Sequence, residues 1–253
     1  MNNIYTRNIP AISAEEQEIL STRSVLVVGC GGLGGYAVEY LSRLGVGRIV
    51  AVDGDSFSET NLNRQILSQT ATLGKSKSEV AVERVHSINP DIEAIAVSDF
   101  LTADNAQSLL EGIDLTIDAL DNVSARLILE DACAKAGINI VHGAVQGWNL
   151  QATVVLPGSN TLHSLYKASE NDANPASDSS SAQDSHQDNA QDSYQDNAQD
   201  SPESKTCLCP TPACCAAIQA AEALKLLIGR ESSLSGQMLF ADLQTMESYT
   251  IPL

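Results

Sequence analysis

The sequence of 253 residues predicts an α/β fold, a Rossmann-like, doubly wound and mostly parallel sheet. Short apolar runs of strand length alternate with helical patterns, which is typical of a parallel sheet with helices on both faces. A glycine-rich turn follows the first apolar run, as in nucleotide-binding βαβ units. Two short strands after the last helix are expected to extend this sheet in the antiparallel direction.

The predicted elements follow one another in a regular order. The run Ser24–Val28 is continuously apolar after its first residue, as expected of a buried parallel strand. Gly45 and Gly47 are natural stops for the helix before them. We expect helices over 14–21, 36–44, 76–88, 103–110, 122–136 and 212–228, and strands over 24–28, 48–52, 92–97, 115–119, 138–141, 151–156, 237–241 and 247–251.

The sequence predicts that the chain consists of four parts. They are an N-terminal arm (1–23), a nucleotide-binding α/β core (24–169), an acidic low-complexity insert in a crossover loop (170–205), and a helix with two strands that complete the same domain (206–253). The stretch 170–204 has nine acidic residues, no Lys or Arg, and an octapeptide repeat. Because it offers almost no apolar surface to bury, we expect it to be disordered.

The charge balance excludes several classes of partner. With 14 basic and 32 acidic residues, the net charge is −18, and no basic footprint for nucleic acid or an anionic membrane is visible. No apolar run approaches the roughly 20 residues that span a bilayer, and the N-terminus shows no signal segment. We therefore expect a cytoplasmic protein, whose six cysteines are thiols or ligands rather than disulfides.

A nucleotide site is predicted where the first strand meets its helix. Gly29-x-Gly31-x-x-Gly34 lies between them, and Asp53 ends the next strand. Glycines allow phosphates to approach the positive helix end, and the acid can bind ribose hydroxyls. Taken alone, this pattern indicates a nucleotide, with NAD as the first candidate and a purely structural turn as the alternative.

Three further features favour ATP over NAD. Asn61–Gln65 follows Asp53 closely, Gly74–Lys77 opens a helix, and the segment from Asp118 to Arg126 begins at the end of a strand. An Arg and a Lys that converge on a nucleotide, together with an acid that can bind a divalent cation, suit a triphosphate that is attacked by a nucleophile. Each feature alone could be a set of surface charges on a loop.

With these motifs in place, the chain resembles the ThiF/MoeB/HesA family, bacterial relatives of the ubiquitin-activating enzymes. The residues that carry the resemblance are Gly29–Gly35, Gly45–Gly47, Asp53, Asp55, Asn61–Gln65, Gly74, Lys77, Ile88–Pro90, Asp121, Asn122, Arg126, Gln219, Glu222, Lys225, Phe240 and Asp242. The resemblance implies ATP- and Mg²⁺-dependent adenylation of the C-terminal carboxylate of a small ubiquitin-like sulfur-carrier protein ending in Gly-Gly, of the thiamine or molybdopterin type, with release of pyrophosphate.

The resemblance also implies residue roles. Asp53 would bind the ribose, and Asp121 would anchor Mg²⁺. Arg7 would reach the ATP site of a partner subunit, which implies a homodimer. The nucleotide turn would consist of Gly29, Gly31, Gly32 and Gly34. The other nucleotide contacts would come from Asp55, Asn61, Arg64, Lys77 and Asn122, with Arg64 and Lys77 polarising the phosphates.

The chain departs from the family in its cysteines. Many members hold a structural zinc with two Cys-x-x-Cys pairs, but Leu162 and Leu165 stand where the first pair is expected, and the chain stops where the second should follow. No zinc site is therefore expected, although an alternative site could be formed by Cys207, Cys209, Cys214 and Cys215. Cys207 and Cys209 are candidate thiols for a covalent step. Cys30 and Cys133 are expected to be buried, His142 to be structural, and Trp148 to belong to the core.

Two other functions stay open. The same adenylation chemistry could act on a peptide or on a modified tRNA nucleoside, and a non-catalytic ATP-binding scaffold is the third reading.

Overall fold

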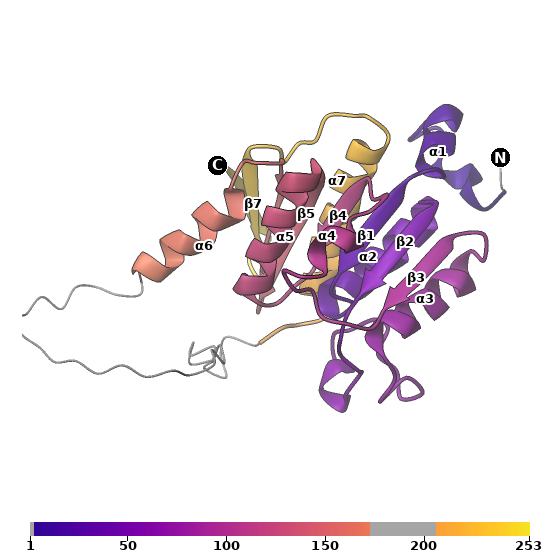
Figure 1. Cartoon of the computed structure of the whole chain (residues 1–253), viewed down its shortest axis with the longest axis horizontal. Helices are drawn as coiled ribbons and strands as arrows, with labels where there is room; N and C mark the ends of the chain where they lie inside the picture. The colour runs from indigo at the N-terminus through magenta and orange to yellow at the C-terminus, as the bar shows by residue number, and fades with distance from the viewer. Residues whose placement is uncertain (1–2, 173–205) are drawn as a thin grey trace, which may run out of the picture.

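The computed structural model describes residues 3–172 and 206–253. In these two ranges, eight strands form one sheet in the order β3-β2-β1-β4-β5-β6-β7-β8 (Figure 1). The parallel strands are β1 (Ser24–Val28), β2 (Arg48–Val52), β3 (Glu93–Val97), β4 (Leu115–Asp118) and β5 (Asn139–Gln146), and the antiparallel extension consists of β6 (Asn149–Val155), β7 (Gln237–Asp242) and β8 (Glu247–Pro252). The predicted fold class is confirmed.

Helices cover both faces of the sheet (Figure 1). Successive side chains of β1 therefore point into two different buried cores, one on each face. Val25 and Val27 point towards α1, α2, α3 and α7, whereas Leu26 and Val28 point towards α4, α5 and α6. The helices are η1 (Asn3–Asn8), α1 (Ala14–Leu20), α2 (Gly32–Leu44), η2 (Glu59–Asn61), α3 (Lys77–Ile88), α4 (Ala106–Leu109), α5 (Val123–Ala136), α6 (Thr161–Asp172) and α7 (Pro210–Leu227).

Several predicted boundaries need correction. The helix α6 was not predicted, and its last three residues fall within the predicted insert. Strand β5 continues to Gln146 rather than ending at 141, because it pairs along its length with β6. Helix α4 keeps only four of the eight residues expected over 103–110. The rest of the predicted insert, 173–205, lies outside the described residues.

The N-terminal arm is fastened to the carboxyl end of α2. The amide groups of Asn8 and Gln17 both donate to the carbonyl of Leu44, at 3.3 and 2.9 Å. The hydroxyl of Tyr5 accepts from the Asn89 amide at 2.6 Å. The arm therefore lies at the opposite end of α2 from the glycine turn.

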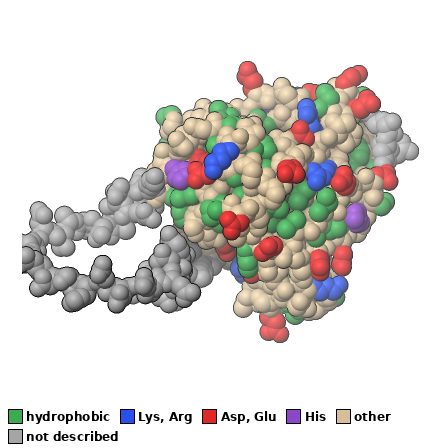
Figure 2. Space-filling view, in the orientation of Figure 1, with side chains coloured by type: hydrophobic (Ala, Val, Ile, Leu, Met, Phe, Trp, Pro, Cys, Tyr) green, Lys and Arg blue, Asp and Glu red, His purple; other side chains and the backbone are tan. Residues whose placement is uncertain are grey.

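Acidic side chains are more prominent than basic ones on one face of the molecule. Figure 2 shows carboxylates scattered over this face among a smaller number of basic groups. Within the described part of the chain, no helix is both long and apolar enough to cross a membrane.

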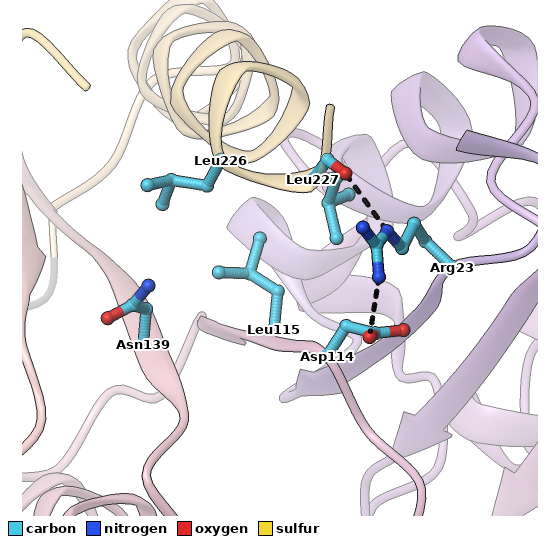
Figure 3. A pocket seen from close by; sticks show the side chains of 6 residues that line it. All are labelled: Arg23, Asp114, Leu115, Asn139, Leu226 and Leu227. Atoms are coloured by element: carbon cyan, nitrogen blue, oxygen red, sulfur yellow. Dashed lines mark hydrogen bonds and ion pairs between the residues drawn. The ribbon is translucent and has the colours of Figure 1, made fainter. Parts of the chain in front are cut away.

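A hollow of about 140 Å³ lies at the amino ends of β1, β4 and β5 (Figure 3). Arg23 closes one side, donating to the carbonyl of Leu227 at 3.0 Å and pairing with Asp114 at 3.2 Å. Ligands of open α/β sheets bind at the carboxyl ends of the strands, which is the opposite edge. We infer that these contacts have a structural function, which is to hold α7 against the sheet.

Candidate nucleotide site

The glycine turn between β1 and α2 is required by packing. Gly29 has a φ of 92°, and a Cβ there would lie 2.5 Å from the carbonyl oxygen of Ala119. A Cβ on Gly34 would lie 1.7 Å from the carbonyl oxygen of Gly29. The nearest atoms to a Cβ on Gly31 or Gly32 are side-chain atoms at 3.4 and 3.8 Å. The backbone of the turn is thus compact, and the N–H groups at the N-terminus of α2 are donors of the kind that bind anions.

Asp53 is fixed beside this turn. Its carboxylate accepts from the backbone N–H of Cys30 at 2.7 Å and from that of Asp55 at 2.9 Å. Burial raises the pKa of Asp53 above its ordinary value, and the two hydrogen bonds and the charge of Lys77 offset only part of that effect. The carboxylate stands at the end of β2, where a nucleotide ribose is bound in this class of fold.

Lys77 is a buried cation at the start of α3. Its Nζ lies 2.8 Å from the Asp55 carboxylate, and its backbone N–H donates to the carbonyl of Asp55 at 2.9 Å. Asp55 was predicted among the nucleotide contacts, and the structure gives it a second role as the counter-ion of Lys77. A phosphate group can replace this carboxylate as the partner of the ammonium group.

Arg64 lies against the glycine turn from the loop after η2. Its Cγ is 3.9 Å from the position of a Cβ on Gly32, and its guanidinium donates to the carbonyl of Thr60 and to the Asn63 side chain, each at 2.9 Å. The Asn61 side chain accepts from the N–H of Ser58 at 2.9 Å. The side-chain oxygen of Asn61 is therefore used to hold the loop, and its NH₂ group is the part that can donate to a phosphate.

Asp121 and Asn122 follow β4 at the same sheet edge. Asp121 is exposed. Asn122 is the N-cap of α5, because its side chain accepts from the N–H of Ala125 at 2.8 Å. The structure thus brings the glycines, the two cations and the carboxylates of Asp53, Asp55 and Asp121 to the carboxyl ends of β1, β2 and β4. Asn122 also lies there and has a structural function as the N-cap.

Arg7 is the exception among the predicted site residues. It is exposed on η1, within the arm that binds the carboxyl end of α2. The 13 residues of α2 span about 20 Å, so Arg7 is far from the glycine turn of its own chain.

A buried polar cluster next to the site was missed from sequence. Asp118 and His142 face each other across β4 and β5, with Nδ1 of His142 2.7 Å from the Asp118 carboxylate. Burial would raise the pKa of Asp118, but the hydrogen bond from His142 and the charge of Arg126 hold it below its ordinary value. The available signal was a carboxylate at the end of a strand that is otherwise buried.

The candidate thiols lie beside the loop of Arg64. The carbonyl of Cys207 accepts from the Asn63 amide at 3.4 Å, and Sγ of Cys209 lies 3.0 Å from the Tyr36 hydroxyl. Burial raises the pKa of the Cys207 thiol, and Arg64 counteracts this only in part. The surroundings of the Cys207 thiol therefore disfavour the thiolate form that a nucleophile requires.

The other cysteines pack in the interior. Cys30, Cys133 and Cys215 are buried, and burial raises the pKa of Cys133 to about 11. Among the described residues, no group of three or more His, Cys, Asp and Glu side chains could hold a metal ion. Leu162, at one expected cysteine position, is fully buried in the core on the α5 side.

The assignment of Trp148 to the core is wrong. It lies in the turn between β5 and β6 and its side chain is 41% exposed.

Comparisons with known proteins, by sequence and by structure, give consistent results. A protein of Haloferax volcanii described as "SAMP-activating enzyme E1" is 32% identical over 250 residues, covering 98% of this chain and 84% of that protein. The "Sulfur carrier protein adenylyltransferase" of Thermus thermophilus is 38% identical over 146 residues, covering 58% of this chain and 54% of its own length. Escherichia coli MccB, solved with ATP, has the same fold, with a TM-score of 0.74 at 18% identity over 100% of this chain and 72% of its own. The pattern of the ThiF family matches residues 5–253, and the chain belongs to that family.

Proposed function

We propose that this chain is an ATP-dependent adenylyltransferase that activates the C-terminal carboxylate of a small ubiquitin-like sulfur-carrier protein and releases pyrophosphate. The observation that carries this proposal is the placement of two cations, Arg64 and Lys77, and the exposed carboxylate of Asp121 around one glycine turn. The two relatives named above, an activating enzyme and an adenylyltransferase, support the same chemistry.

Magnesium fits the residues at this edge of the sheet. Mg²⁺ is usually held by one or two carboxylates together with substrate phosphates and water. Asp121 is an exposed carboxylate and, within the described residues, it has no ion pair that would compete. When bound with ATP, the ion neutralises charge on the phosphates. We also propose that the protein does not require zinc.

The residues of the chain then act by alignment and charge. The N–H groups at the start of α2 hold the phosphates, and Asp53 binds the ribose. The carrier carboxylate is already ionised and needs no general base. One of its oxygens forms a bond to the α-phosphorus while the α–β phosphoanhydride bond breaks. Arg64 and Lys77 stabilise the negative charge that moves onto the departing pyrophosphate.

The position of Arg7 supports a homodimer as part of the proposal. Since Arg7 lies at the far end of α2, a helix about 20 Å long, we infer that it serves a nucleotide in the site of a second copy. We propose that two chains exchange this arginine and that the protein acts in the cytoplasm.

The test is ATP–pyrophosphate exchange with and without a purified carrier ending in Gly-Gly. We expect exchange that depends on the carrier and is lost when its last glycine is removed. Arg64→Ala should abolish exchange, whereas the matched control Arg43→Ala, an exposed arginine at the far end of α2, should not. Exchange supported only by a peptide or by tRNA would favour the alternative acceptors, and no exchange with any acceptor would leave a binding scaffold.

A further inference from the structure

A chain of hydrogen bonds runs beneath the loop that follows β4. His142 and Asp118 are both fully buried, with 2.7 Å between Nδ1 and the carboxylate. The hydroxyl of Tyr166, from α6, lies 3.4 Å from Nε2 of the same histidine. All three groups are satisfied when Nδ1–H donates to Asp118 and the tyrosine O–H donates to Nε2.

Arg126 connects this chain to the loop. One of its terminal nitrogens donates to the Tyr166 hydroxyl and the other donates to the carbonyl of Leu120. Its Nε lies 3.7 Å from the Asp118 carboxylate and makes no hydrogen bond among the described residues. The side chain is 9% exposed, so its charge is compensated mainly by Asp118.

Both peptide groups of Leu120 are held by this cluster. Its N–H donates to the Asp118 carboxylate at 3.0 Å, and its carbonyl accepts from Arg126. The next residue is Asp121, the proposed magnesium anchor. A residue whose neighbour is tied through both its N–H and its carbonyl has little freedom to move.

We propose that Tyr166 and Arg126 are positioning residues that hold the loop 119–122 so that Asp121 meets the metal of bound Mg·ATP. This inference rests on the proposed function. Tyr166 orients Arg126, and Arg126 fixes the carbonyl before Asp121. Groups that orient a metal ligand from behind contribute to metal affinity without touching the metal.

The variant Tyr166→Phe removes the hydroxyl and keeps the ring. The edge contact of the ring with His142, at 6.1 Å between centroids, and its contact with the guanidinium of Arg126, at 5.3 Å, remain available. Tyr40→Phe is the matched control. Tyr40 is also a partly buried tyrosine, and its hydroxyl donates to the carbonyl of Ala213 at 3.4 Å, outside this cluster.

ATP affinity is measured by titration calorimetry on the full chain, once with excess chelator and once with Mg²⁺. We expect Tyr166→Phe to bind metal-free ATP as the wild type does. It should lose about three- to tenfold of the affinity gained from Mg²⁺, the range expected for the hydrogen bond that orients Arg126. Tyr40→Phe should keep the full gain.

Two results would overturn the positioning role. One is an equal gain from Mg²⁺ in Tyr166→Phe and the wild type. The other is an equal loss with and without the metal, since general loosening produces that result. If Tyr166→Phe does not fold, Arg126→Lys tests the same point, because lysine keeps a charge near Asp118 but cannot bridge Tyr166 and Leu120. A wild-type chain that binds no ATP would refute the proposed function itself.

Discussion

Replacing Gly34 by alanine tests whether the glycine turn is compact for steric reasons. The new Cβ would lie 1.7 Å from the carbonyl oxygen of Gly29, 2.7 Å from its carbonyl carbon, and 3.2 Å from the Cβ of Ala119. The first two are backbone atoms and cannot rotate away. The turn must therefore open by more than about 1 Å at the point where β1 enters α2.

The free energy of unfolding decides between two opposing effects. Alanine is favoured over glycine inside a helix by about 1 kcal/mol. Overpacking usually costs about 1–3 kcal/mol and more when the neighbours are rigid. Since both main obstacles here are backbone, we expect the upper end of that range and a net loss of at least about 2 kcal/mol.

Chemical denaturation of the two variants Gly34→Ala and Gly32→Ala gives the comparison. A Cβ on Gly32 would meet nothing closer than 3.8 Å, so its free energy of unfolding should stay within about 0.5 kcal/mol of the wild type. ATP binding by Gly34→Ala should fall as well, because the N–H groups of the turn move. Equal stability of the two variants would refute the steric argument.

Three further predictions follow from the site. Asp121→Ala should abolish pyrophosphate exchange without shifting the thermal unfolding midpoint, because the side chain is exposed; normal exchange would remove Asp121 from the mechanism. The double variant Cys207→Ser, Cys209→Ser should keep exchange, and any defect should appear only in a later thiol step, measured as sulfur transfer. The pKa of Asp118 is held below its ordinary 3.8, so its stabilising contribution is present above that pH and is lost as the pH falls through the lowered value. Urea denaturation should thus show a steeper loss of stability below pH 3.8 in the wild type than in Asp118→Asn, and parallel slopes would contradict this.

The parts of the site that could be predicted are those whose signal is local. The turn from Gly29 to Gly34 lies within one strand–helix junction, and Asp53 ends the following strand, so spacing along the chain is enough to bring them together. The doubly wound, mostly parallel character of the sheet followed from the alternation of helices and strands, whereas the order of the strands was not predicted. Neither inference required knowledge of contacts between distant segments.

The helix α6 shows what local patterns miss. Its first N–H groups, those of Leu162 and His163, donate to the two carboxylate oxygens of Glu130 at 3.0 and 2.9 Å. The residue that caps α6 therefore lies more than 30 positions earlier, on α5. The cluster of Asp118, His142 and Tyr166 has the same character, because its members come from three separate elements.

The strongly acidic composition and a triphosphate substrate are compatible for a related reason. A net charge of −18 describes the whole chain, but charges separated by more than about 8 Å are largely screened at physiological ionic strength. Lys77, Arg64 and the N-terminus of α2 lie together at one edge of the sheet. Asp55 neutralises the buried ammonium group of Lys77 when no phosphate does so. The cation of the site therefore always has an anionic partner. The local arrangement of charges, rather than their sum, therefore determines which anion the chain can bind.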